Sequence, residues 1–165
     1  MKVLIAVDGS DCSARAIEFV SERKWDKDDQ FSVVSIVEPI PADVGVGYFP
    51  VNSGGIYQQQ YDDIANICGT SAATLKRLMP ESHVEVKVET GLVAETICDY
   101  AETWDADLII LGSHGRKGIS HFLLGSVAEE VLKKAPCSVE VIKLKQKPHA
   151  AKPEKPSKAK RVVKA

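Results

Sequence analysis

The chain has 165 residues, of which 44% are hydrophobic, and this suits a single domain that buries a substantial core. No apolar run approaches the ~20 residues needed to cross a bilayer, so a transmembrane helix is excluded. The net charge of −2 hides an asymmetry, because residues 143–165 carry nine Lys or Arg and one acid, whereas residues 1–142 carry 12 basic and 22 acidic groups. An acidic body therefore carries a basic tail of net charge +8.

Strand and helix patterns alternate through the first half of the chain. An apolar run over residues 2–7 predicts a strand, and the Asp-Gly-Ser that follows predicts a turn into a helix. Apolar residues at helical spacing mark this helix: Ala14, Ile17, Phe19 and Val20. The run "FSVVSIV" at 31–37 predicts a second strand. Residues 38–56, rich in Pro, Gly and Ser, predict a long connection, and residues 57–79 predict a helix that ends at Pro80.

The second half continues the same alternation. Residues 83–89, "HVEVKVE", alternate apolar and polar side chains, which is typical of an edge strand. Residues 92–104 predict a helix whose inner stripe is Val93, Ile97 and Tyr100. Residues 107–111, "DLIIL", are nearly all apolar, as in a central strand covered on both faces. A last helix is marked by Val127, Val131 and Leu132, and residues 138–142 predict a fifth strand.

Alternating strands and helices predict an α/β fold with a parallel sheet, right-handed crossovers and helices on both faces. We expect a five-stranded doubly wound sheet formed by residues 1–144. The remaining residues 145–165 are rich in Lys, Pro and Ala. They have too few apolar side chains to offset the entropy of ordering, so we expect a disordered tail.

The cysteines and the N-terminal segment bear on the cellular compartment. The four cysteines are scattered, with no CxxC pair and no zinc-like spacing to His, which favours free thiols over a disulfide or a metal site. The first residues lack the pattern of a secretory signal. We therefore expect a cytoplasmic protein.

The stretch "GSHGRKGISHFLLGS" at 112–126 carries the clearest sign of function. Its glycines are Gly112, Gly115 and Gly125. The first two directly follow a buried strand, and the third opens a helix together with Ser126. Ligands of doubly wound sheets bind beyond the carboxyl ends of the strands, where Asp8 also lies. Glycines permit close backbone approach, helix N-terminal N–H groups suit phosphate, and Arg116 and Lys117 add positive charge.

A plainer interpretation stays open at each position. Glycines after a strand often form an ordinary turn, Gly-Ser before a helix is often only a cap, and Asp8-Gly9 is a common turn pair. His114 either fills the turn or donates to a phosphate or ribose. The chain lacks the GxxxxGK[ST] and GxGxxG strings, which excludes a P-loop and the dinucleotide fingerprint. No pairing of nucleophile and base is evident, so efficient catalysis is not expected.

The spacing G-xx-G-x9-G-S resembles the ATP-binding signature of the universal stress protein family. The segment "VLIAVDGSDCSARAIEFV" is similar to that family's first strand and helix, "GLVAETICDYA" to its third helix, and "DLIILGSHGRKGISHFLLGSVAEEVLKKAPCSVEVIK" to its C-terminal third. The similarity covers about residues 1–144. It implies an ATP-binding domain with a Rossmann-like sheet, as in adenine nucleotide alpha hydrolase-like proteins, and we expect the strand order 3-2-1-4-5.

The resemblance also implies where ATP would lie. Asp8 would contact ribose or adenine, the backbone of Val37 would meet the adenine edge, and Ala6 would border the base. The glycines and their neighbours would line the ribose and phosphate path: Gly112, His114, Gly115, Arg116, Gly125, Ser126 and Val127. Any Mg²⁺ would arrive with ATP, bound mainly by its phosphates with Asp8 as a candidate ligand. Neither a resident metal site nor a catalytic residue is expected, and we expect slow ATP hydrolysis at most.

Two classes of function remain open at this stage. The first is a nucleotide-responsive regulator of stress or signalling, which the family resemblance implies would form a homodimer through the edge strand at 138–142 and act on an unidentified protein partner. The second is an interaction protein that acts through its basic tail and dimer edge without nucleotide dependence. A +8 tail could contact nucleic acid, anionic lipid or an acidic partner, but it has no aromatic residues to stack on bases, which argues against specific nucleic-acid recognition.

Overall fold

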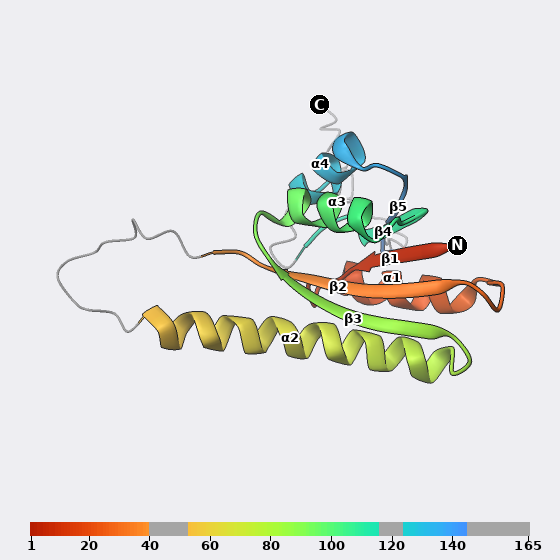
Figure 1. Ribbon diagram of the computed structural model, residues 1–165, viewed down its shortest axis with the longest axis horizontal. Coiled ribbons are helices and arrows are strands. Elements are labelled where there is room, and N and C mark those ends of the chain that lie inside the picture. The colour runs from red at the N-terminus through yellow and green to blue at the C-terminus, as the bar shows by residue number, and fades with distance from the viewer. Residues whose placement is uncertain (40–52, 116–123, 145–165) are drawn as a thin grey trace, which may run out of the picture.

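A computed structural model describes residues 1–39, 53–115 and 124–144 of the chain, and Figure 1 shows how their helices and strands are arranged. Strands and helices alternate along the chain. In order they are β1 (Lys2–Ala6), α1 (Asp11–Glu22), β2 (Gln30–Val37), α2 (Ser53–Leu78), β3 (His83–Thr90), α3 (Val93–Thr103), β4 (Leu108–Gly112), α4 (Ser126–Lys134) and β5 (Ser138–Ile142). The predicted succession of elements is confirmed. Arg116, the rest of the 116–123 segment and the tail 145–165 lie outside the described residues.

The five strands form one sheet in the order β3-β2-β1-β4-β5, and all neighbouring strands pair in parallel. This order confirms the predicted doubly wound α/β fold. The central strand β1 pairs with β2 through Ala6↔Val34 and with β4 through Ala6↔Leu111, so these three strands end at a common rim. The winding direction reverses between β1 and β4, which is where ligands bind in sheets of this kind.

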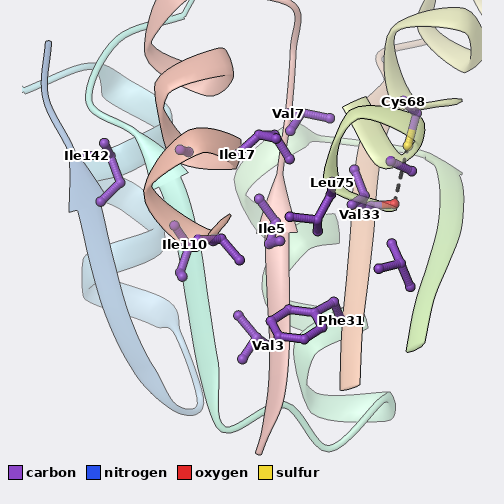
Figure 2. Packing of buried hydrophobic residues seen from close by; sticks show 14 of the residues in the cluster. Val3, Ile5, Val7, Ile17, Phe31, Val33, Cys68, Leu75, Ile110 and Ile142 are labelled. Atoms are coloured by element: carbon purple, nitrogen blue, oxygen red, sulfur yellow. Dashed lines mark hydrogen bonds between the residues drawn. The ribbon is translucent and has the colours of Figure 1, made fainter. Parts of the chain in front are cut away.

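Two apolar layers hold the helices on the sheet. Helices α1 and α2 cover one face, and α3 and α4 cover the other (Figure 1). Figure 2 shows the first layer, in which Ile5, Phe31 and Ile110 of neighbouring strands lie against α1 and α2. All three side chains are fully buried. Burying each side chain of this kind contributes about 1.5–3 kcal/mol, so these layers are the main source of stability.

The predicted inner stripe of α3 differs from the structure, and one apolar residue that marked α4 is exposed. Leu132 is 47% exposed, whereas Ala128 and Val131 are the buried residues of α4. In α3 the predicted Val93 and Tyr100 are only partly buried, and the inner positions belong to Ala94, Ile97, Cys98 and Ala101. Small alanine side chains let both helices approach the sheet closely, and larger neighbours are then turned toward the rim of the contact.

The boundary of the long connection is also different from the prediction. Helix α2 begins at Ser53 rather than near residue 57, so four residues assigned to the loop belong to the helix. The first N–H groups of any helix have no intrahelical partner, and residues of low helix propensity are tolerated there. Residues 40–52 of the predicted connection lie outside the described residues.

The four cysteines are free thiols, three of them buried and Cys137 half-buried. Burial raises the pKa of the Cys68, Cys98 and Cys137 thiols, which keeps them protonated and poorly reactive. In the part of the chain that the structure describes, no helix is long and apolar enough to cross a membrane.

Candidate functional site

The turn after β1 is fixed by local hydrogen bonds. Asp8 Oδ1 accepts from the Ser10 N–H at 3.0 Å and from the Ser10 hydroxyl at 2.6 Å. Gly9 has φ +81°, in the left-handed region that favours glycine. Ser10 is the N-cap of α1, and its Oγ accepts from the Ser13 N–H at 3.2 Å. Asp8 therefore does stabilise the turn, and the same hydrogen bonds fix the position of its carboxylate at the rim.

Gly112, at the end of β4, packs against the first turn of α1. A Cβ placed on Gly112 would lie 2.7 Å from Cys12 Cβ and 2.9 Å from the Cys12 backbone carbon. Real Cβ atoms essentially never approach so closely, so only glycine fits without moving the helix. The absence of a side chain brings the loop after β4 directly over the N-terminus of α1.

Gly115 carries the same loop across Asp8. A Cβ on Gly115 would lie 2.8 Å from Asp8 Oδ2. The Ser10 hydroxyl also donates to the His114 carbonyl at 3.2 Å, so one serine holds both the turn and the loop. The structure thus brings together Asp8 and the 112–115 loop, which are more than 100 residues apart in sequence.

Gly125 joins the loop to α4. Its N–H donates to the Ser113 carbonyl at 2.8 Å, and a Cβ on Gly125 would lie 3.0 Å from that oxygen. Gly125 is the N-cap of α4 and supplies no side-chain hydrogen bond to the first turn, which begins at Ser126. The first N–H groups of α4 therefore have no side-chain acceptor from the cap residue, and they lie at the positive end of the helix dipole. Helix ends of this kind bind anions.

His114 lies between these features. Its Nδ1 is 3.0 Å from Ser113 Oγ, and Ser113 Oγ is 3.8 Å from Cys12 Sγ. Ser113 is only 1% exposed. The other ring nitrogen, Nε2, is buried and has no hydrogen-bond partner among the residues that the structure describes. A buried polar atom of this kind is uncommon and calls for a ligand or another group that satisfies it.

The end of β2 is where the adenine contact of Val37 was predicted. The Val37 carbonyl already accepts from the Gly91 N–H at 3.0 Å, so it faces β3. The Val34 carbonyl accepts from the Val7 N–H at 2.9 Å, so it faces β1. Because carbonyls two residues apart in a strand face the same neighbour, the carbonyl of Ile36 faces the gap beyond the end of β1. Ile36 is thus better placed than Val37 to offer a carbonyl there.

The remaining predicted residues border the site or fall outside it. Ala6 and Val127 are half-buried and pack against the core layer beneath α3 and α4. Ser126 is exposed at the start of α4. Sequence reasoning missed Ile36, the Cys12–Ser113 contact and the second role of Ser10. The one available signal was a serine directly after a buried strand, at position 113.

The residues around this rim also bear on metal binding. Within residues 1–39, 53–115 and 124–144, no group of three or more His, Cys, Asp or Glu side chains could hold a metal ion. The chemistry that the described rim offers is hydrogen-bond donation to an anion from α4, with a carboxylate at Asp8 and backbone carbonyls at β2.

Known proteins are similar to this chain in sequence. The universal stress protein family matches residues 1–143. Universal stress protein MJ0531 of Methanocaldococcus jannaschii is 29% identical over 148 residues, covering 88% of this chain and 84% of that protein. Universal stress protein A homolog 2 of Coxiella burnetii is 30% identical over 145 residues, covering 87% of this chain and 95% of that protein.

Solved structures agree on the fold. The protein MJ0577 of Methanocaldococcus jannaschii has a TM-score of 0.70 at 24% identity, with 88% of this chain and 97% of that chain covered. The universal stress protein of Archaeoglobus fulgidus in complex with dAMP has a TM-score of 0.59 at 21% identity, with 86% and 97% covered. A family protein of Arabidopsis thaliana with AMP bound has a TM-score of 0.57 at 17% identity, with 87% and 91% covered. Since the family match spans nearly the whole described fold, the chain belongs to the universal stress protein family.

Proposed function

We propose that this protein is an ATP-binding module that acts as a nucleotide-responsive regulator of stress or signalling rather than as a fast enzyme. The observation that carries the proposal is that three glycines lie together at the carboxyl rim of the sheet, where they allow close backbone packing. Gly112 and Gly115 bring the loop over α1 and Asp8, and Gly125 presents the start of α4 without a side-chain cap. Related structures in complex with dAMP and AMP support an adenine nucleotide as the ligand.

The base and ribose would occupy the β1–β2 end of the rim. Asp8 would bind the ribose or the base, and Ala6 would border the adenine ring. The Ile36 carbonyl faces this region, so we assign it the adenine-edge contact in place of the Val37 carbonyl. The carboxylate of Asp8 is held by Ser10, and a positioned acceptor of this kind suits a sugar hydroxyl.

The phosphates would lie along the loop and α4. The N–H groups of Ser126 and Val127 and the Ser126 hydroxyl would donate to phosphate oxygens. A Cβ on Gly112, Gly115 or Gly125 would meet other atoms of the protein at 3.0 Å or less, so glycine at these positions lets the loop and the start of α4 come together at the rim. We propose that Arg116 adds positive charge near the terminal phosphates and that Mg²⁺ arrives bound to ATP.

Calorimetric titration with Mg-ATP tests the proposal, using wild type, Gly125→Val and the matched control Gly69→Val. Nothing lies within 4 Å of a Cβ on Gly69 in α2, whereas a Cβ on Gly125 meets the Ser113 carbonyl. We expect saturable binding by wild type and by Gly69→Val, and no measurable binding by Gly125→Val that retains its circular dichroism spectrum. Failure of folded wild type to bind ATP, ADP or AMP would overturn the proposal.

We further propose that the module is a cytoplasmic homodimer that pairs through β5. This strand is an edge of the sheet, and its Val139 and Val141 side chains are only half-buried. Exposed edge strands pair readily with another chain. Sedimentation at micromolar concentration should give a dimer, and replacing Val139 with Pro should give a monomer. A wild-type monomer at that concentration would argue against the edge pairing.

The charge of the tail favours a second candidate function, an interaction through residues 143–165 that does not need nucleotide. This segment carries a net charge of +8 against an acidic body. Truncation after Leu144 separates the two functions. ATP binding should survive the truncation, whereas retention on nucleic acid or anionic lipid at low salt should disappear if the tail is responsible.

A further inference from the structure

The side chains behind the 112–115 loop form a short hydrogen-bonded chain: Cys12 Sγ, Ser113 Oγ and His114 Nδ1. The distances are 3.8 Å between Sγ and Oγ and 3.0 Å between Oγ and Nδ1. Cys12 is 7% exposed and Ser113 is 1% exposed, so this chain is shielded from water. Three side chains from α1 and the loop are therefore coupled through one serine hydroxyl.

The direction of these bonds follows from the donors available. A serine hydroxyl has one proton, and either contact of Ser113 can use it. Sulfur is a weak acceptor, whereas an unprotonated imidazole nitrogen is a good one. The favoured arrangement has the Cys12 S–H pointing to Ser113 Oγ and the Ser113 O–H donating to His114 Nδ1. A neutral ring that accepts at Nδ1 carries its proton on Nε2.

The backbone around His114 places it beside the phosphate end of the candidate site. The Ser10 hydroxyl donates to the His114 carbonyl at 3.2 Å, and the Gly125 N–H donates to the Ser113 carbonyl at 2.8 Å. A Cβ on Gly125 would lie 3.4 Å from His114 Cα. His114 is thus held between the first turns of α1 and α4, while Nε2 is buried without a partner among the described residues.

His114 is one of the residues that the family resemblance implies would line the phosphate path. We propose that Ser113, with Cys12 behind it, holds the His114 ring in the tautomer that carries its proton on Nε2, so that the ring can donate to a phosphate oxygen of the nucleotide. The inference rests on the proposed nucleotide function and assigns two different tasks within it. His114 contacts the ligand, and Ser113 is a positioning residue. The opposite tautomer would direct a lone pair toward an anion, so the orientation set by Ser113 favours phosphate over a neutral ligand.

The tautomer is measured first, without nucleotide. Long-range ¹⁵N–¹H correlation spectra distinguish Nδ1–H from Nε2–H histidine, and the His114 signal is identified by its loss in His114→Gln, since the chain has four histidines. We expect the Nε2–H form in wild type at pH 8 and a mixture of both tautomers in Ser113→Ala. A wild-type ring protonated on Nδ1 would overturn the inference whatever the protein binds.

Calorimetric titrations with Mg-ATP and with adenosine then test the contact. His114→Phe keeps an aromatic ring without a donor, and His114→Gln keeps an N–H donor at a similar reach. We expect His114→Phe to weaken ATP binding by about 10- to 100-fold, the range for a hydrogen bond to a charged group, with adenosine binding unchanged. His114→Gln should recover most of the ATP affinity.

The outcomes separate the inference from the function on which it rests. Wild type that binds ATP while His114→Phe binds it equally well would overturn the role of His114 and leave the nucleotide function intact. A parallel loss of ATP and adenosine binding in His114→Phe would mean that the ring only supports the loop. Folded wild type that binds neither ligand would overturn both.

Discussion

The two ends of the sheet use polar groups in opposite ways. At the amino end, several polar groups of the chain hydrogen-bond to one another. Asp107 Oδ2 accepts from the Lys2 N–H at 2.7 Å, Lys2 Nζ donates to the Trp104 carbonyl at 3.1 Å, and the 6%-exposed Asp29 pairs with the Met1 amino group. At the carboxyl rim, glycines bring backbone segments together, α4 starts without a side-chain cap, and His114 Nε2 has no partner among the described residues.

This difference suggests a way to tell structural residues from ligand-binding residues, namely whether their polar groups hydrogen-bond within the protein. A carboxylate that completes the hydrogen bonds of its own chain contributes to folding, and its loss is felt in stability. At the rim, the glycines contribute to folding because they allow backbone segments to pack closely. The N–H donors at the start of α4, which have no side-chain acceptor from the cap, are instead available to a ligand. Substitutions at the amino end should therefore alter the free energy of unfolding, whereas substitutions at the rim should alter nucleotide binding as well.

The largest effect on stability is expected at the amino end, from Phe31→Ala. Phe31 is fully buried and meets the Trp25 ring edge-on, with ring centroids 5.2 Å apart. Removing such a side chain leaves a cavity and should lower the free energy of unfolding by about 3–5 kcal/mol. Urea unfolding measures the loss. ATP affinity of the folded fraction should stay unchanged, and a matching fall in affinity would contradict the division between the two ends.

At the rim, Gly112→Ala should have the next largest effect and should alter both properties. The added methyl would lie 2.7 Å from Cys12 Cβ, so α1 or the loop must move. Overpacking of this kind costs about 1–3 kcal/mol, and displacement of the loop should also weaken ATP binding. Gly69→Ala in α2 is the control, because nothing lies within 4 Å of its Cβ. A variant with unchanged unfolding and binding would show that the close approach is easily relaxed.

The sequence predicted the features that depend on local pattern. Runs such as "FSVVSIV" and "DLIIL" are too apolar for anything but buried strands, and the alternation of strands with helices leaves few topologies. The glycine spacing also identified the rim, because the loop follows a strand directly. These predictions needed only neighbouring residues, or the general rule that parallel strands share one ligand-binding edge.

The features that the sequence could not predict depend on packing between distant segments. Whether Ile36 or Val37 offers its carbonyl to the gap is fixed by the pairing Ala6↔Val34, which no local pattern reveals. The contact of Cys12 with Ser113 joins residues 101 positions apart. The inner stripe of α3 was misjudged at Val93 and Tyr100 because an 11-residue helix with several apolar side chains fits more than one orientation.

Asp29→Asn offers a pH-dependent test of the amino end, with an expected loss of about 1–2 kcal/mol at neutral pH. The Met1 amino group, and the Asp26 N–H that donates to Oδ2 at 2.7 Å, hold the pKa of the Asp29 carboxyl below its usual value. A carboxylate with a lowered pKa stabilises the fold above the unfolded-state pKa of about 3.9, and this contribution is lost as the pH falls through the folded-state pKa.

The amino partner sets the other side of the window. Asp29 raises the pKa of the Met1 amino group, so its contribution is lost as the pH rises through that raised value. Urea midpoints of wild type and Asp29→Asn should therefore differ most between about pH 5 and 8, and the difference should shrink toward pH 2 and, in part, toward pH 11, where the Asp26 N–H still donates to the carboxylate. A difference that stays constant across this range would show that the charge of Asp29 is not what stabilises the amino end.

The smallest effect is expected from Ser10→Ala, which removes one hydroxyl that serves both stability and the rim. Loss of an N-cap costs about 1 kcal/mol, and here the same hydroxyl also contacts Asp8 Oδ1 and the His114 carbonyl. Ser10→Thr keeps a hydroxyl and is the matched control. If the hydroxyl serves only α1, Ser10→Ala should lower the free energy of unfolding by the same amount with and without ATP. We instead expect Ser10→Ala to weaken ATP binding as well, because Asp8 and the loop at His114 both lose a hydrogen-bond partner. Unchanged ATP affinity would show that Ser10 has only a structural role.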